Sequence, residues 1–269
     1  MSNLLYLYGL IPSHESTTTP LPSLKGFDGD GVIYPLRIGD VTAFVSELDA
    51  DSYSEETISD KINNDMEWLQ EKAFHHHETV QQLAQLYTIV PLKFCTLYKN
   101  PDSLITTVEN HKEKLHESFQ LLEGNEEWNL KIYCNDEQLK KKVSESNATI
   151  EAKRQEISQL PPGRQFFEKK KIDELINQEL ENEKNLFCEE IHGKLKKISL
   201  FGSIKKNWSK DVTGRKEKMA WNSVFLLPSA NVEEFIEEIK LDEETYGLNG
   251  WDFEVSGPWP PYHFSSFTS

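Results

Sequence analysis

Near its carboxyl end the chain reads Trp251-Asp252-Phe253-Glu254-Val255-Ser256-Gly257-Pro258-Trp259-Pro260-Pro261-Tyr262-His263-Phe264. Apolar and acidic side chains alternate over its first five residues, as they do in a strand with one buried face. Three prolines follow, and because proline fixes φ, the segment loses little entropy when it becomes ordered. Its aromatic rings need an apolar surface to cover them. The stretch therefore predicts a last strand that leaves a sheet and continues into a rigid terminus docked on the second of two domains.

Length and charge limit the class of protein. A chain of 269 residues can form one large domain or two ordinary ones, each with its own core. The formal net charge of −16 argues against a nucleic-acid partner, whose phosphates need clustered Lys and Arg. The same charge favours solubility and opposes self-association, so we expect a protein that is monomeric alone.

The cysteines and the chain start indicate the compartment. Cys95, Cys134 and Cys188 are odd in number, widely spaced and without a CxxC pair. They predict neither a disulfide framework nor a zinc ribbon, and they fit a reducing cytosol. The amino terminus lacks the basic region of a signal peptide, and the apolar run 88–98 is far too short to cross a bilayer. We expect a soluble cytoplasmic protein, with no membrane partner.

The first 135 residues predict one α+β domain. Strands are expected at 4–10, 32–38, 41–46, 89–98 and 128–134, and Gly39-Asp40 joins the second and third as a hairpin. Helical periodicity predicts a long helix from Ser54 to Tyr87 and another from Pro101 to about Glu123, with Asn100 as its cap. A sheet with helices on one face, ferredoxin-like in kind, is the natural packing for the domain 1–135.

Residues 136–269 predict a second α+β domain. Two amphipathic helices, interrupted by Leu160-Pro161-Pro162-Gly163, predict a long antiparallel helical hairpin over 136–198, packed as a coiled coil. Its apolar stripe is narrow and its outer faces are charged, so it should project from the globule. Strands are expected at 198–208, 219–227 and 251–255, with an acidic helix at 232–244 capped by Asn231.

Patterns typical of catalysis or metal binding are incomplete. His75-His76-His77 cannot chelate one metal from a helix, because adjacent residues point about 100° apart. The HExxH pattern that begins at His77 has Gln81 in place of the second ligand. We expect one buried, hydrogen-bonded histidine and two wet ones. The 45 Asp and Glu residues lie mostly on charged helix faces with ordinary pKa values. We predict no metal, no cofactor and no catalytic residue.

Two features favour binding. Residues 194–218 hold nine Lys and Arg residues against Asp211 and Glu217 only. This basic segment could pair with the acidic helix of the same chain, remain solvated, or steer a partner. The strands are rich in Trp and Tyr; core packing explains most of these rings, and an exposed subset would form an interaction patch. The candidate partner-binding residues are Lys205, Lys206, Lys210, Arg215, Trp259 and Tyr262.

Ordered short strings carry a resemblance to a known family. They are Leu5-Tyr6-Leu7-Tyr8-Gly9, Trp68-Leu69, His77-Glu78, Ile89-Val90-Pro91-Leu92-Lys93-Phe94, Glu127-Trp128-Asn129-Leu130-Lys131-Ile132-Tyr133, Pro162-Gly163-Arg164-Gln165-Phe166-Phe167 and Gly257-Pro258-Trp259-Pro260-Pro261-Tyr262. Together, from residue 4 to 264, they resemble the gas vesicle protein F/L family (GvpF/GvpL), nearer the L member. Cys95 departs from the family pattern, in which relatives commonly have glycine.

The resemblance implies a cytosolic accessory protein for assembling gas vesicles. Such a protein is expected to bind the small apolar shell protein and other accessory proteins, prevent their aggregation and assist nucleation, and to be a minor vesicle component in some cases. The resemblance brings no catalytic residue and no cofactor. One competing function is a small-molecule-binding or metal-dependent enzyme on the same scaffold, with its pocket near His77 and the strand 91–98. A purely structural shell component is the third.

Overall fold

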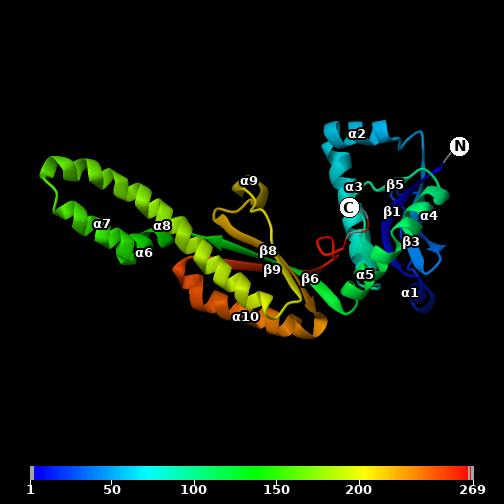
Figure 1. Ribbon diagram of the computed structural model, residues 1–269. Coiled ribbons are helices and arrows are strands. Elements are labelled where there is room, and N and C mark those ends of the chain that lie inside the picture. Colours follow the sequence, from blue (N-terminus) through cyan, green and yellow to red (C-terminus); the bar gives the residue numbers. More distant parts are fainter. Residues whose placement is uncertain (1–2, 266, 268–269) are drawn as a thin grey trace. The chain divides into compact units, whose positions relative to one another are not determined.

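The computed structural model describes residues 3–265 and 267, which form a mixed α+β fold with two antiparallel sheets (Figure 1). The chain divides into two compact units. The first unit holds the described residues up to Glu127 together with those from Pro258 onward, and the second unit is Trp128–Gly257. This division differs from the boundary predicted near residue 135. The strand 128–134 groups with the second unit, and the carboxyl terminus groups with the first.

The sheet of the first unit has the strand order β2-β3-β1-β4, with β5 also paired to β1. Its strands are β1 (Asn3–Pro12), β2 (Tyr34–Ile38), β3 (Val41–Asp49), β4 (Val90–Pro91) and β5 (Leu97–Tyr98). The predicted β2–β3 hairpin is present, and its turn residue Gly39 has a φ of 62°, which glycine adopts without strain. The single predicted strand 89–98 is instead two short ones, β4 and β5.

Within the described part of this unit, five helices lie around the sheet. They are α1 (Ser13–Thr18), α2 (Glu55–Asn64), α3 (Met66–Ala84), α4 (Pro101–Asn110) and α5 (Lys112–Leu122). Both predicted long helices are interrupted, the first at Asp65 and the second at His111. Asp65 leaves the helical conformation and its carboxylate accepts from the N–H of Trp68, so it ends α2 and caps α3. The Pro-, Ser- and Thr-rich segment 12–22 contains the short helix α1.

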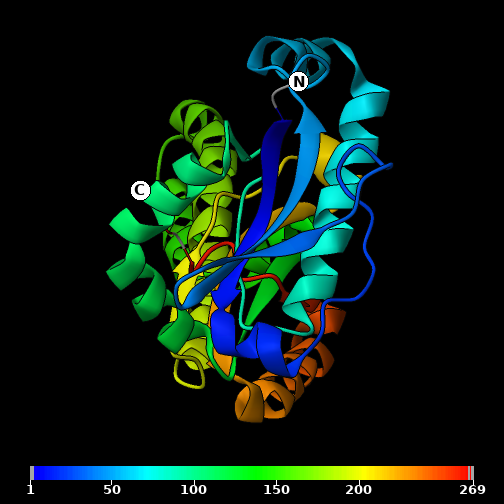
Figure 2. The same ribbon diagram turned by 90° about the vertical axis from the view of Figure 1, so that its right-hand side faces the viewer.

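The core of the first unit lies between α3 and one face of the sheet. The strands contribute Tyr6, Tyr8 and Phe44, and α3 contributes Val80 and Leu83, all fully buried. Figure 2 shows α3 running along the strands, which fits the contacts between α3 and β1. Because successive side chains of a strand alternate between faces, the burial of Leu5 and Leu7 as well shows that β1 is covered on both sides.

The sheet of the second unit has the order β7-β8-β6-β9. Its strands are β6 (Asn125–Cys134), β7 (Phe201–Ile204), β8 (Lys218–Pro228) and β9 (Trp251–Trp259). Leu130 and Ile132 of β6, Phe225 of β8 and Phe253 of β9 face one core with helix α8. The predicted strand 198–208 is shorter in the structure, and the predicted strand 251–255 extends to Trp259.

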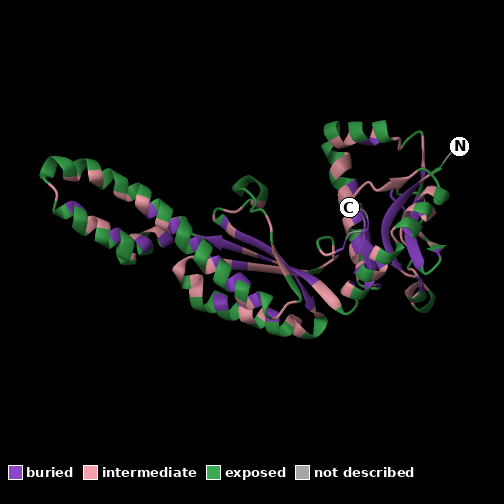
Figure 3. Cartoon of the chain, in the orientation of Figure 1, coloured by how far each residue is buried: buried purple, intermediate pink, exposed green. Residues whose placement is uncertain are grey.

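The helices of the second unit include the predicted hairpin. They are α6 (Asp136–Ser146), α7 (Ala148–Ser158), α8 (Pro162–Lys196), α9 (Lys210–Thr213) and α10 (Val232–Tyr246), with 3-10 turns at Ser229–Asn231 and Gly247–Asn249. Both α6 and α7 pack on α8, and the outer faces of this hairpin are exposed (Figure 3). Asn147 breaks its first arm by capping α7. Asn231 precedes α10, but its side chain donates to the carbonyl of Ile198 instead of capping the helix.

Candidate interaction surfaces

The carboxyl terminus docks on helix α3. Pro260 is buried, the ring of Trp259 lies 5.5 Å from that of His77, and the Tyr262 hydroxyl lies 3.2 Å from Nε2 of His76. The prediction of a docked terminus is therefore confirmed, but it docks on the first unit, whereas the sequence placed it on the second. Trp259 and Tyr262 were partner-binding candidates. Both rings instead contact α3 of the same chain, although Tyr262 remains 37% exposed.

His76 is the centre of the hydrogen bonds at this docking site. Its Nε2 lies 3.1 Å from the carbonyl of Leu92, which can only accept, so Nε2 carries the proton. Nδ1 therefore accepts from the Tyr6 hydroxyl at 2.8 Å, and Tyr6 in turn accepts from the N–H of Cys95 at 3.2 Å. The Tyr262 hydroxyl oxygen accepts from the same Nε2–H, at 3.2 Å. Burial lowers the pKa of His76 to about 4, so the imidazole is neutral.

One of the three consecutive histidines is thus buried and hydrogen-bonded, as the sequence predicted. His75 and His77 are half-buried, so the expectation that both would be wet was too simple. Burial also lowers the pKa of His75. Of the residues that the structure describes, no three His, Cys, Asp or Glu side chains gather in a geometry that could hold a metal ion.

A large groove lies between helix α2 and strands β1 and β5. It has a volume of about 840 Å³, within the usual range for sites that bind a ligand. The residues that line this α2 groove are Leu4, Ala50, Ser54, Glu55, Ile58, Ser59, Ile62, Cys95, Leu97, Tyr98 and Lys99. Its walls are mainly aliphatic and aromatic. Glu55 and Lys99 are the charged groups of this lining, one acidic and one basic.

Cys95 is the thiol that lines this groove. Its φ of 61° places it in the left-handed region, where a non-glycine residue is uncommon. Its side chain is half-buried, and burial raises the pKa of the thiol to about 11. Because the thiolate is the reactive form, this group is a weak nucleophile at neutral pH. Cys134 and Cys188 are buried and, like Cys95, free of disulfides.

The rate of Cys95 alkylation is expected to keep rising with pH above the pH at which the rate of an ordinary thiol levels off. The reaction with iodoacetamide should accelerate about tenfold per pH unit from pH 7 to 10, because a raised pKa keeps the thiolate fraction small throughout. A thiol with the usual pKa of about 8.5 would level off near pH 9. Mass spectrometry of the Cys95 peptide measures the rate, with circular dichroism at each pH as the folding control. A plateau near pH 9 would contradict the buried position of Cys95.

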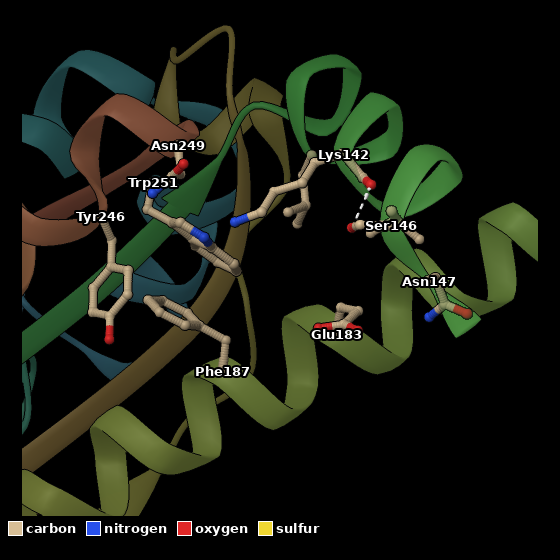
Figure 4. Close-up of a pocket in the computed structure, with 10 residues that line it drawn as sticks. Lys142, Ser146, Asn147, Glu183, Phe187, Tyr246, Asn249 and Trp251 are labelled. Atoms are coloured by element: carbon tan, nitrogen blue, oxygen red, sulfur yellow. Dashed lines mark hydrogen bonds between the residues drawn. The ribbon is translucent and has the colours of Figure 1, made fainter. Parts of the chain in front are cut away.

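A second cavity lies in the second unit and is too small for an ordinary substrate. Its volume is about 170 Å³, against several hundred for typical ligand sites. Figure 4 shows Phe187 from α8 beside Trp251 and Tyr246; the Phe187 and Trp251 rings stack at 4.0 Å. Ser146 points its hydroxyl to the carbonyl of Lys142 on its own helix. The serine is therefore not paired with a base, and the cavity offers no nucleophile arrangement among its lining residues.

The basic segment 194–218 divides into two groups. Lys194 forms ion pairs with Glu238 and Asp242 of α10, as the intramolecular alternative predicted. Arg215 pairs with Asp252 at 2.8 Å and with Glu254 at 3.2 Å, both on β9. Arg215, a partner-binding candidate, thus has acidic partners within its own sheet.

The remaining lysine candidates have no such partners. Lys210 donates to the carbonyl of Lys216. No carboxylate of the described residues forms an ion pair with Lys205 or Lys206, which follow directly after the edge strand β7. Trp208, close by, is 47% exposed and lies over Lys131. Among the Trp and Tyr residues of the strands, Tyr6, Tyr8, Trp221 and Trp251 are buried in the cores.

The sequence reasoning missed the α2 groove. The groove exists because α2 ends at Asp65 and the chain turns into α3, whereas one continuous helix was predicted. The available signal was Asp65 itself, since Asp is a preferred capping residue and stands three positions before Trp68, whose N–H it accepts.

Three comparisons place the chain among known proteins. The family model "Gas vesicle synthesis protein GvpL/GvpF" matches residues 4–266. Gas vesicle protein L of Streptomyces sp. (strain CB03234) is 21% identical over 230 residues, which cover 86% of this chain and 82% of that protein. Gas vesicle protein F of Nostoc sp. (strain PCC 7120) is 25% identical over 243 residues, 89% of each chain.

Solved structures show the same fold. The crystal structure of GvpF from Anabaena sp. PCC7120 aligns with a TM-score of 0.75 at 22% identity, over 100% of both chains. GvpF from Microcystis aeruginosa aligns with a TM-score of 0.68 at 18% identity, over 99% of this chain and 100% of that one. In the described part of the protein, no helix has the length and apolarity that crossing a bilayer requires. Since the family model spans nearly the whole chain, the protein belongs to the gas vesicle synthesis protein GvpL/GvpF family.

Proposed function

We propose that this protein is an accessory factor of gas vesicle assembly that acts in the cytoplasm. It binds the small apolar shell protein and other accessory proteins, prevents their premature aggregation, assists nucleation of the vesicle and associates with the vesicle while it forms. Family membership supports a gas vesicle role. The strand order β2-β3-β1-β4 supports our assignment of the first unit as ferredoxin-like.

The α2 groove is the observation that carries this proposal. A shell protein that keeps water from its inner face must expose apolar surface before it assembles, and such surface drives aggregation. Ile58, Ile62 and Leu97 give the groove walls that can cover an apolar segment. The net charge of −16 keeps such complexes apart in solution, because like-charged particles repel one another.

The same groove argues for binding and against catalysis. Its titratable residues are Glu55, Cys95, Tyr98 and Lys99. Burial raises the pKa of both Cys95 and Tyr98, which keeps both groups neutral at pH 7. No histidine lies in this lining, so the groove offers none of the imidazole groups that most often serve as general bases. The protein is therefore proposed to act by contact, without a cofactor.

Placing a charge inside the groove tests the proposal. Ile62 is a half-buried wall residue, so Ile62→Asp should leave the core packed while making burial of an apolar segment unfavourable. We expect at least a tenfold loss of shell protein that stays soluble and co-purifies on co-expression. Phe74→Asp is the matched control, since Phe74 is an exposed apolar residue of α3 outside the groove lining.

Different outcomes test the groove as the binding surface and the assembly function itself. Equal recovery of shell protein with wild type and Ile62→Asp would show that the groove is not the binding surface. Failure of the wild-type protein to bind the shell protein or any sibling accessory protein would remove the assembly function itself. Alkylation of Cys95 with a bulky reagent gives an independent block of the same groove and should have the effect of Ile62→Asp.

A further inference from the structure

Strand β7 lies at an edge of the second unit's sheet. In the order β7-β8-β6-β9 its neighbour is β8 alone among the strands that the structure describes. An edge strand presents backbone N–H and C=O groups that another strand can pair with, and proteins use such edges for recognition or guard them. Three further features of β7 distinguish these two roles: its hydrogen-bond register, its exposed apolar side chains and its charge.

The register shows which backbone groups point outward. Ile204 lies opposite Ser223 of β8, and the N–H of Lys205 donates to the carbonyl of Asn222 at 2.7 Å. In an antiparallel pair, residues that bond to the neighbouring strand alternate with residues whose N–H and C=O point away from it. Ser203 therefore bonds towards β8, and Gly202 and Ile204 direct their backbone groups to the free edge.

Apolar side chains lie exposed along this edge. Ile204 is 58% exposed, Trp208 beyond it is 47% exposed, and Leu200 precedes the strand with a similar exposure. Gly202 lies against the Phe225 ring, where a Cβ would come within 3.0 Å. The Trp208 ring instead lies over Lys131 of β6, away from this edge. An added strand would cover Leu200 and Ile204 while its backbone bonds to Gly202 and Ile204.

The charge of the edge selects among possible occupants. Lys205 and Lys206 have no ion-pair partner among the described carboxylates, and Lys210 follows on α9. If two copies of β7 paired with each other, these lysines would gather on one seam and repel. Lysines alone would suffice to guard the edge, but a guarded edge does not need exposed Leu200 and Ile204 beside them.

We propose that β7 is a docking edge, at which an extended, acidic and partly apolar segment of a different polypeptide adds as a fifth strand to this sheet. The backbone of Gly202 and Ile204 pairs with the segment, Leu200 and Ile204 cover its apolar side chains, and Lys205 and Lys206 pair with its carboxylates. This inference goes beyond the proposed function, because it concerns the second unit and does not depend on the α2 groove.

Labelled peptides provide the direct test. The probe is a fluorescein-labelled ten-residue peptide in which valine and glutamate alternate, and its matched control alternates valine and lysine. Fluorescence anisotropy with the full-length protein at low salt should show binding of the glutamate peptide at least tenfold tighter than that of the lysine peptide. Hydrogen exchange should slow in the peptide that contains 200–206 when the glutamate peptide binds.

Variants of β7 separate backbone pairing from simple charge attraction. Ile204→Pro removes an outward N–H and leaves the bonds of Ser203 and Lys205 to β8 in place, so we expect at least a tenfold loss of binding. Ile204→Thr keeps both the donor and the strand preference, and should lose threefold or less. The double variant Lys205→Glu, Lys206→Glu should reverse the preference, so that the lysine peptide binds better. Thermal unfolding of each variant serves as the folding control.

Several results would overturn the proposal. They are absence of binding by the glutamate peptide, equal binding of both peptides, and an Ile204→Pro variant that folds and binds as tightly as the Ile204→Thr variant. Sedimentation of the wild-type protein as a dimer that Ile204→Pro converts to a monomer would assign the edge to a second copy of the chain instead.

Discussion

Deletion of residues 258–269 is expected to lower the free energy of unfolding of the first unit by at least about 4 kcal/mol. The deletion removes the buried Pro260 and Phe267 and the Trp259 ring that lies on His77. Burial of each large apolar side chain contributes about 1.5–3 kcal/mol. The N–H of His263 also donates to the Glu127 carboxylate at 3.0 Å, and removing this donor from a buried carboxylate adds to the loss.

Hydrogen exchange followed by mass spectrometry can locate this loss. Peptides of α3 should lose protection in the truncated protein, whereas peptides of α8 in the second unit should keep theirs. Tyr262→Phe is the mild control, because it removes one hydrogen bond to His76 and should cost about 1 kcal/mol. Unchanged protection of α3 after truncation would mean that the terminus does not stabilise the first unit.

The sequence predicted elements whose cause is local. Alternating Leu and Tyr residues identified β1, and the Gly39-Asp40 turn identified the β2–β3 hairpin. The predicted cap was confirmed at Asn100, which shares a capping box with Ser103. At Ser54, where a helix was predicted to begin, the hydroxyl accepts from the N–H of Thr57 and caps α2. In each case the residues that determine the geometry lie within a few positions of one another, so no tertiary information was needed.

Interruptions of helices escaped the periodicity argument. The apolar stripe continues across Asp65, His111 and Asn147 in the sequence, and at Asn147 the helices on either side, α6 and α7, pack in the same core. Periodicity measures that stripe and is insensitive to one residue that leaves the helical conformation. Asp65 and Asn147 do so because their side chains cap the next helix. A capping side chain favours the break over a continuous helix by a free energy of a few tenths to about 2 kcal/mol. A difference this small cannot be read from composition.

Long-range placement was the other limit. The rings of Trp259 and Tyr262 showed that the terminus needed a surface, but nothing local identified α3 as that surface. The partner of His76 was likewise set by the fold, since Tyr6 lies 70 residues away in the chain. For the basic segment, composition alone predicted the charge and the alternatives, whereas separating the paired Arg215 from Lys205 and Lys206 required the strand order of the sheet.

Acidification is expected to destabilise the first unit between about pH 6.5 and pH 4, through His76. Its pKa is lowered from 6.5 to about 4 because burial disfavours the imidazolium, and its Nδ1 lone pair already accepts from Tyr6. In this interval the unfolded state binds a proton that the folded state does not, so stability falls as the pH falls. The contribution is fully present above pH 6.5 and lost below pH 4, and amounts to about 3 kcal/mol.

Variants in which one histidine is replaced separate the effect of His76 from that of the carboxylates, which also titrate in acid. His76→Gln removes the ionisable group, so it should be less stable than the wild type at pH 7 but lose less stability between pH 6.5 and 4. His77→Gln is the matched control for a histidine substitution on the same helix, because the hydrogen bond from Tyr6 does not depend on it. Urea unfolding at half-unit pH steps gives the slopes. Parallel curves for wild type and His76→Gln would show that His76 takes up its proton in the folded protein, and that the docked terminus tolerates a charge at its centre.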